Sequence, residues 1–482
     1  MIVRNSALIR RLLPKNAFAR GVSVLAGGTA GAQLLTILAA PLLTRLYSPE
    51  DFGMLAVYAS LLALIGVISS FRYELAITLP EDDVEAANLA VLSLLLVLLT
   101  TVLIAVLVTL LANPVATVLG VPAMAGYFWL LPVGVLLSGG YTVFNYWCVR
   151  NKRFTAIATT RLRQALATIV VQLSAFKLGG IALLLGHVMG QSAGTVNLAR
   201  PALTSESFKQ VSWAGIKRAV NRYRRFPLFT TWSGLFNVAG HKLPPLLFAS
   251  LFGVAAAGLY ALSHRILSIP ASLVGSAIAK VFLSLGAEAH RGQRLSSMYQ
   301  TVQEKLIQIG LPPMFILIVT GPDLFAFLFG EEWREAGVIA QWLSISMFAS
   351  FLVSPLSMIF TILEKQSVGL LLQVILFLSR LVGIGIGVWY DSIMLSVAMF
   401  SLGGVFGYSL YLILGVIYTK TGFYNLLRAL VTTSAYALLI ITPVIWLSHS
   451  TMGVGRWIGW VISLSFLLIY YMLIVQLSKN EI

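Results

Sequence analysis

Four basic side chains fall inside apolar stretches of this sequence, where a charge is costly. They are Arg72, Lys242, Arg265 and Arg380. A Lys, Arg or Asp at the centre of a membrane-length apolar segment costs about 2.5–3.5 kcal/mol, so such residues generally face a bundle interior or a watery cavity. Of the seventeen acidic residues, only Glu74 falls in such a stretch. The excess of cations predicts an anion-binding cavity, because guanidinium groups bind phosphate in bidentate fashion and lysine adds a point charge.

These residues also have purely structural interpretations. Arg72 and Glu74 could mark the end of a span, and Arg380 could be a buried partner between two helices. Arg72 and Glu74 are two residues apart and would lie on different faces of one helix, so we expect each to have another partner. His241 and His264 could take part in ion coupling, although interhelical hydrogen bonds are the commoner use of such histidines.

The sequence contains no pattern typical of a metalloprotease, a serine hydrolase or an ATPase. It has no HExxH and no GxxxxGK[ST], and the stretch GGTAGAQ (27–33) lacks the P-loop lysine. The single cysteine, Cys148, excludes an internal disulfide and a cysteine metal site. We therefore expect that the protein is not an enzyme and needs no cofactor. Any energy that it uses would come from an H⁺ or Na⁺ gradient, the membrane potential or consumption of the product.

Long apolar segments must position these charges. The chain has 482 residues and is 58% hydrophobic and 10% charged, against about 25% charged in soluble domains. This composition predicts an all-α polytopic membrane protein with about fourteen (12–14) transmembrane helices. Turn signals at Asn113-Pro114 and Val121-Pro122 should separate two of these spans. We place the spans at about 21–46, 53–79, 87–111, 126–149, 158–177, 179–199, 226–251, 256–285, 305–329, 336–363, 366–389, 391–418, 423–447 and 455–477.

The basic residues are unevenly distributed, and the distribution predicts topology. With a cytoplasmic N-terminus, the cations gather in residues 1–20, 150–153 and 200–225, on one side of the membrane. This positive-inside bias places both termini in the cytoplasm. It accounts for the net charge of +16 without a nucleic-acid partner. The basic segment 1–20 suits either a short helix on an anionic membrane surface or a frayed tail.

Two sequence patterns recur in the two halves of the chain. LYSPEDFGMLAVYA, from Leu46, and LFGVAAAGLYALSH, from Leu251, place Gly53 and Gly258 at equivalent positions. NPVATVLGVP (113–122) and GPDLFAFLFGEE (321–332) share a proline, an apolar run and a glycine. A chance match is the alternative, because glycine and proline are common at helix junctions. An even number of intervening spans gives the two halves the same orientation.

The repeat predicts two parallel six-helix lobes around a central cavity. We assign the N-lobe (helices 1–6) to 21–199, a cytoplasmic basic linker to 200–225, and the C-lobe (helices 7–12) to 226–418. Helices 13 and 14 and a short cytoplasmic tail occupy 419–482.

The stretch LTRLYSPEDFG (43–53), followed by RYE (72–74) and a short acidic loop, resembles bacterial polysaccharide-biosynthesis flippases. These are the O-antigen (Wzx-like) translocases of the multidrug/oligosaccharidyl-lipid/polysaccharide (MOP) exporter superfamily. The resemblance implies a MATE-like fold, with two parallel lobes, in the bacterial inner membrane. It is weaker after the first two helices, so the roles of Lys242, Arg265 and Arg380 rest on their charge.

The resemblance implies a flippase that moves undecaprenyl-diphosphate-linked oligosaccharide repeat units from the cytoplasmic to the periplasmic leaflet. The units would serve O-antigen, capsule or exopolysaccharide assembly, and translocation would proceed by alternating access through a cationic cavity. The implied partners are membrane lipids and the polymerase and chain-length regulator of the same pathway. In this hypothesis Arg72 helps to capture the diphosphate, and Glu74 holds a basic neighbour or couples a cation.

Three other functions are compatible with the composition. A cation-coupled multidrug exporter of the same superfamily would need several acidic residues in mid-membrane, where this chain offers Glu74 alone. A membrane-embedded polymerase or ligase would need larger outer loops with polar residues. A scaffold without transport would leave the buried cations unexplained.

Overall fold

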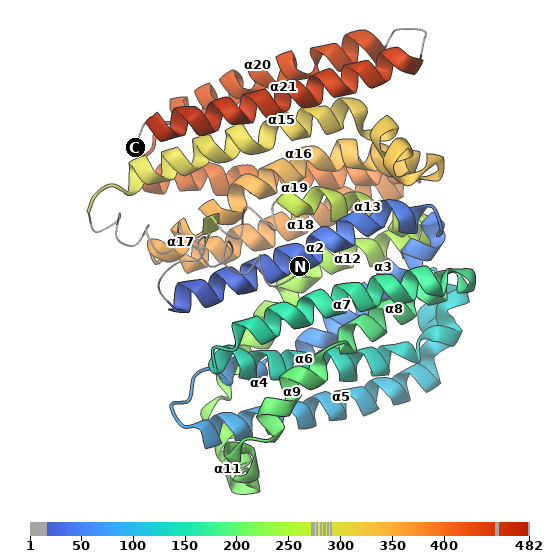
Figure 1. The fold of residues 1–482 in the computed structure, drawn as a ribbon, viewed down its shortest axis with the longest axis vertical. Helices are drawn as coiled ribbons and strands as arrows, with labels where there is room; N and C mark the ends of the chain where they lie inside the picture. Colours follow the sequence, from blue (N-terminus) through green and yellow to red (C-terminus); the bar gives the residue numbers. More distant parts are fainter. Residues whose placement is uncertain are drawn as a thin grey trace, which may run out of the picture. The chain divides into compact units, whose positions relative to one another are not determined.

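The computed structural model describes residues 17–270, isolated positions between 271 and 291, and residues 292–448 and 453–480. Throughout these ranges the chain forms helices and turns, without a strand. The predicted all-α class is therefore confirmed for this part of the chain. The chain divides into two compact units, residues 1–261 and 262–482, both built of helices (Figure 1). Each unit has a buried apolar core of its own.

The first unit begins with one long helix and a capped second helix. A serine, Ser48, ends the turn between them, accepts a hydrogen bond from the Asp51 N–H and donates its own N–H to the Asp51 carboxylate. This capping box explains why a helix starts within the SPED motif. The helices of this unit are α2 (Ala17–Thr44), α3 (Pro49–Ile68), α4 (Tyr73–Ala76), α5 (Asp83–Val118), α6 (Leu130–Arg150), α7 (Phe154–Ser174), α8 (Gly180–Ser192), α9 (Thr195–Leu203), α10 (Glu206–Lys209), α11 (Trp213–Arg222) and α12 (Thr231–Phe252).

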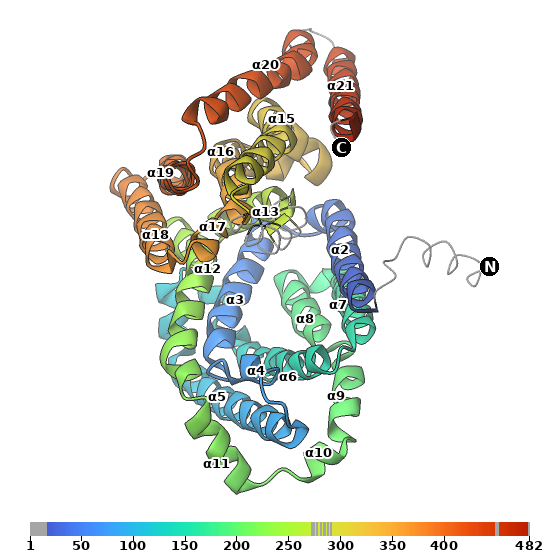
Figure 2. The same cartoon turned by 90° about the vertical axis from the view of Figure 1, so that its left-hand side faces the viewer.

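Helices of the first unit pack in pairs, some between neighbours in the chain and some between helices far apart in sequence. The pairs include α2 with α7, α3 with α12, α5 with α6, and α6 with α8. Figure 2 views many of these helices nearly end on. Shorter helical segments connect these helices: the 3₁₀ helices η1 (Pro122–Tyr127) and η2 (Phe176–Leu178) and the π-helix η3 (Phe226–Thr230).

The second unit follows the same pattern of long packed helices. Helix α13 (Val254–Pro270) crosses from the first unit into the second. The second unit then contains α15 (Leu295–Phe329), η5 (Glu331–Trp333), α16 (Arg334–Leu356), α17 (Ile359–Ile362), α18 (Gln366–Trp389), α19 (Ile393–Thr419), α20 (Phe423–Ser448) and α21 (Gly453–Asn480). Helix α18 packs on α19, α15 on α16 and α20, and α20 on α21.

Eight helices in the described ranges are long and apolar enough to cross a membrane, and two shorter apolar helices accompany them. The count of fourteen spans stays a prediction. The boundaries at 366–389, 391–418 and 423–447 agree with α18, α19 and α20 to within two residues. Residues 1–16 and most of 271–291 lie outside the described residues. Most of the predicted N-terminal segment (1–20) and the later part of the predicted span 256–285 fall in these ranges.

The predicted turn at Asn113-Pro114 is wrong. Helix α5 continues through Pro114 to Val118, and the chain turns only at Gly120, where φ is +67°. In an apolar environment a helix keeps its backbone groups hydrogen-bonded, so a proline that removes one such bond need not end it. Helix α5 is therefore 36 residues long.

The structure supports the internal repeat. Helices α5 and α15 are 36 and 35 residues long. Each contains a proline of the repeated motif near its end (Pro114, Pro322). Each is followed by a glycine with positive φ, Gly120 at +67° and Gly330 at +108°. Both glycines adopt a backbone conformation that other residues rarely do, which explains their recurrence.

The two glycines of the first repeated motif are a point of close backbone contact. A Cβ added at Gly53 would lie 2.0 Å from the Val254 carbonyl oxygen, and one at Gly258 would lie 1.9 Å from the Pro49 carbonyl oxygen. These residues belong to α3 and to the first turns of α13, within the first unit. The missing side chains allow α3 and α13 to pack backbone against backbone.

Candidate anion-binding cavity

Arg72 lies in a turn after α3, and Glu74 lies in the short helix α4 that follows this turn. Helix α3 ends at Ile68, and the backbone is left-handed at Phe71 (φ 48°) and Arg72 (φ 62°). The Thr100 hydroxyl of α5 donates to the Ser69 carbonyl at 3.1 Å and holds the turn on α5. The predicted continuous span 53–79 is therefore wrong, because two successive residues with positive φ end the helix. Such conformations cost of order 1–3 kcal/mol each and persist only where neighbouring structure maintains them.

Arg72 and Glu74 pair with each other. The Arg72 Nη1 lies 3.6 Å from Glu74 Oε1, and the Ser70 hydroxyl donates to Glu74 Oε2 at 2.5 Å. The expectation of separate partners is wrong, because the two residues do not follow one another along a helix. Glu74 is 2% exposed. A carboxylate that is this deeply buried is stabilised by a cation and a hydroxyl donor together.

A glycine of α12 makes room for the Arg72 guanidinium. A Cβ at Gly234 would lie 2.5 Å from Arg72 Nη2 and 2.8 Å from Nε. The Nε atom is buried and has no hydrogen-bond partner among the described residues. An unpartnered buried donor costs about 1–3 kcal/mol. A ligand acceptor at this position would remove that cost.

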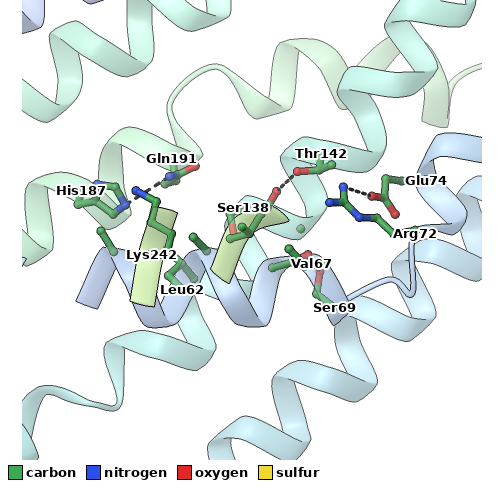
Figure 3. A pocket seen from close by; sticks show the side chains of 15 residues that line it. Leu62, Val67, Ser69, Arg72, Glu74, Ser138, Thr142, His187, Gln191 and Lys242 are labelled. Atoms are coloured by element: carbon green, nitrogen blue, oxygen red, sulfur yellow. Dashed lines mark hydrogen bonds and ion pairs between the residues drawn. The ribbon is translucent and has the colours of Figure 1, made fainter. Parts of the chain in front are cut away.

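Arg72, Glu74 and Lys242 line one cavity of about 380 Å³ in the first unit. The Arg72–Glu74 pair lies at one end, and Lys242 of α12 lies at the other, beside His187 and Gln191 of α8 (Figure 3). The Gln191 Nε2 and His187 Nε2 atoms are 3.4 Å apart. The remaining wall consists largely of small and hydroxyl-bearing residues: Ala59, Leu62, Ala63, Gly66, Val67, Ser69, Ser138, Gly139, Thr142 and Val238.

The charges of the cavity do not balance. Arg72 is partly neutralised by Glu74, whereas Lys242 forms no ion pair with any residue that the structure describes. Two cations and one carboxylate leave one positive charge uncompensated. A charge in a poorly hydrated site favours a counter-ion strongly, so the cavity is suited to an anion.

A family model described as "Polysaccharide biosynthesis protein" matches residues 42–338, which is more than half of the chain. The chain belongs to this family. The matched region contains the cavity residues Arg72, Glu74 and Lys242, and it includes the LYSPEDFG and RYE motifs. This membership confirms the resemblance seen in the sequence.

One relative is the succinoglycan biosynthesis transport protein ExoT of Rhizobium meliloti (strain 1021). The two chains are 25% identical over 328 residues, a match that covers 66% of this chain and 63% of ExoT. The chain thus spans less than two thirds of the length of this relative.

Two solved structures are similar over most of the chain. The lipid II flippase MurJ, in an inward closed conformation, matches with a TM-score of 0.72 at 14% identity, covering 94% of this chain and 99% of MurJ. An inward-facing multidrug resistance MATE family transporter of the MOP superfamily matches with a TM-score of 0.60 at 15% identity, covering 82% and 94% of the two chains. The predicted fold class of this multi-pass membrane protein is confirmed.

The remaining predicted site residues of this family member lie elsewhere. His241 is exposed and is not among the residues that line the cavity. Arg265 and His264 are half-buried in the part of α13 that belongs to the second unit. Arg380 of α18 is 6% exposed, also in the second unit. The structure therefore brings together Arg72, Glu74 and Lys242 in one cavity, and the roles of all seven predicted site residues stay predictions.

Arg380 is held by aromatic residues of α19. Its guanidinium carbon lies 5.1 Å from the ring centroids of both Phe400 and Tyr408, and Nη2 donates to the Tyr408 hydroxyl at 3.1 Å. Its Nε has no partner among the described residues. This environment supports the structural interpretation that Arg380 is buried between helices, since a guanidinium stacks favourably on aromatic faces.

Sequence reasoning missed the residue that holds the loop after RYE. Arg150, at the end of α6, donates to the carbonyls of Ile77, Pro80 and Glu81 and to the Asp83 carboxylate. The sequence showed only that Arg150 is a basic residue at a span end. This arginine therefore attaches the acidic loop to the end of α6.

His187 and Gln191 were also missed as cavity residues, and Gly234 was missed as the neighbour of the Arg72 guanidinium. Each lies on a helix whose rotation the apolar composition does not specify. A polar His-x-x-x-Gln pair, one turn apart in an otherwise apolar helix, was the signal that could have pointed to a lined cavity. Among the described residues no group of His, Cys, Asp and Glu is arranged to hold a metal ion.

Proposed function

We propose that this protein is a flippase for oligosaccharide repeat units linked to undecaprenyl diphosphate. It moves them from the cytoplasmic to the periplasmic leaflet of the bacterial inner membrane by alternating access, for assembly of an O-antigen, capsule or exopolysaccharide. Membership of the polysaccharide biosynthesis family, similarity to a succinoglycan transport protein and the MurJ-like fold support this proposal.

The observation that carries the proposal is the charge imbalance of the cavity. A diphosphate would supply a negatively charged partner for Lys242 and an oxygen that accepts a hydrogen bond from Arg72 Nε. Guanidinium and ammonium groups form the strongest hydrogen bonds with phosphate oxygens, because both partners are ionised. The small and hydroxyl-bearing wall between the two cations leaves room and hydrogen-bonding groups for a sugar.

The proposal assigns a role to each charged residue of the cavity. Arg72 and Lys242 bind the anionic part of the substrate, and Glu74 competes with it for Arg72. Coupling to an H⁺ or Na⁺ gradient would use this buried carboxylate, since it is the acidic residue of the cavity. Membrane lipids surround the protein, its termini are cytoplasmic, and a polymerase and a chain-length regulator act on the product.

The multidrug exporter has less support. Its cationic substrates would require a cavity with excess negative charge, whereas Glu74 is already paired with Arg72. An organic cation would meet Lys242 without a carboxylate to compensate it. Like charges in a poorly hydrated cavity repel each other strongly.

Reconstitution tests the proposal. Purified protein is placed in liposomes that carry a fluorescent undecaprenyl-diphosphate oligosaccharide, and a membrane-impermeant quencher reports the fraction in each leaflet. Wild type should move the probe. Lys242→Gln should lower the affinity of the protein for the probe by about 10- to 100-fold, since a charge-assisted hydrogen bond contributes roughly 1.5–3 kcal/mol. Lys177→Gln removes an exposed lysine of η2 and should have no effect.

Two outcomes would contradict the proposal. If wild type moves no lipid-linked sugar but exports an organic cation against a gradient, the exporter replaces the flippase. If Lys242→Gln and Lys177→Gln behave alike while wild type is active, the cavity is not the binding site. Arg265→Ala in the same assay tests whether the second unit contributes a cation.

A further inference from the structure

Helix α11 is a short helix that packs on the start of α5. Its Gly215, Ile216 and Ala219 form a buried face. The Asn88 side chain of α5 accepts a hydrogen bond from the Ser212 N–H at 3.2 Å. On the same side of the helix, seven residues after Gly215, Arg222 contacts both carboxylate oxygens of Glu85, at 2.9 and 2.8 Å. One side of α11 is thus fixed to the protein.

The attachment point sets the depth of α11 in the membrane. Charged residues of α5 end at Glu85, and residues 86–149 contain no Asp, Glu, Lys or Arg. Ala86 and Ala87 belong to the same buried cluster as Ile216 and Ala219. Helix α11 therefore lies at the level where the polar surface meets the apolar part of α5. This level is the headgroup region of a bilayer.

The opposite side of α11 has an exposed aromatic residue beside exposed cations. Trp213, Lys217 and Val220 are spaced i, i+4 and i+7 and lie on one flank, with Trp213 75% and Val220 37% exposed. Arg224 and Arg225 follow the helix and are exposed. No ion pair joins Lys217, Arg224 or Arg225 to an acidic group of the described residues.

We propose that this flank binds the headgroups of anionic phospholipids in the leaflet beside α5. Trp213 would lie in the interfacial layer, where its amphipathic ring is favourable, and Lys217, Arg224 and Arg225 would contact lipid phosphates. Lipid is favoured over an acidic protein because the flank combines a tryptophan and a valine with cations at headgroup depth, next to an apolar helix. This inference does not depend on what the cavity transports.

Hydrogen–deuterium exchange of the full chain in nanodiscs tests the proposal. In discs that contain phosphatidylglycerol, amides of residues 213–222 should exchange more slowly than in pure phosphatidylcholine discs. High salt should reduce the difference. Each cation near an anionic surface contributes about fivefold to lipid affinity, so Lys217→Gln/Arg224→Gln/Arg225→Gln should lose on the order of a hundredfold. The slowing of exchange should then disappear.

Matched variants keep the result interpretable. Lys217→Gln alone should reduce the effect, and Lys177→Gln, which removes another exposed lysine, should preserve it. Unchanged exchange at the start of α5 shows that the triple variant is folded. Equal exchange of wild type in both lipids, or full slowing in the triple variant, would overturn the proposal. So would slowing that requires a soluble acidic polypeptide such as polyglutamate, since it would assign the flank to a protein partner.

Discussion

Gly234→Ala is the sharpest test of the cavity, because it moves one side chain without removing a charge. The added Cβ would lie 2.5 Å from Arg72 Nη2, 2.8 Å from Nε and 3.0 Å from Cζ. Non-bonded carbon contacts are most favourable at about 3.5–4.0 Å. The guanidinium must therefore move by roughly 1 Å from its position in the cavity.

The expected effects of this substitution have opposite signs. Alanine is favoured over glycine inside a helix by about 1 kcal/mol, so thermal stability should be equal to that of wild type or slightly higher. Affinity for an undecaprenyl-diphosphate probe should fall by about 10- to 100-fold, the value of one charge-assisted hydrogen bond. Binding is measured by titration of the purified protein, and translocation by the liposome assay.

Two controls separate this mechanism from general damage. Gly240→Ala lies on the same helix, and its added Cβ meets no atom within 4 Å. This variant should bind like wild type. In an Arg72→Ala background, Gly234→Ala should have no further effect, because the two changes act through one group. An additive loss in the double variant would refute the argument.

Three further changes have definite expected outcomes. Glu74→Gln removes the carboxylate that competes for Arg72, so anion affinity should rise by about fivefold; a loss of affinity would show that Glu74 positions Arg72 instead. Arg150→Met removes hydrogen bonds to three carbonyls from a side chain that is 11% exposed. It should cost about 2–4 kcal/mol, read as a lower unfolding temperature and faster amide exchange in residues 77–83. Gly258→Ala forces a Cβ against the Pro49 carbonyl and the Gly53 nitrogen, which are backbone atoms that cannot move aside. It should lower the unfolding temperature and the yield of folded protein, and a normal yield would show that this contact adjusts freely.

The repeat was predictable from the sequence because it depends on residues that have one structural use. Gly120 and Gly330 recur because both end a long helix with positive φ, and Gly53 and Gly258 recur because both lie against backbone. The structure gave a reason for each recurrence. The apolar runs likewise predicted α18 to α20 closely, since span length follows from bilayer thickness.

The cavity was less predictable, because it depends on local conformation and helix rotation. Phe71 and Arg72 adopt positive φ without being glycine, and nothing in their residue types indicates it. The helix break follows from contacts such as that of Thr100 with the Ser69 carbonyl. Lys242 and His187 meet only through the rotation of α12 and α8, which a uniformly apolar sequence does not encode.

The Arg72–Glu74 pair changes how the charge of the cavity should be understood. Counting cations along the sequence gave Arg72 and Lys242 equal weight, but Glu74 offsets much of the positive charge of Arg72. Under the proposed function, an incoming anion would therefore meet its strongest uncompensated attraction at Lys242, beside His187 and Gln191. It gains Arg72 only by sharing that guanidinium with Glu74. An internal carboxylate of this kind limits affinity, and a transporter benefits from that limit, since a substrate held too tightly would not be released on the other side.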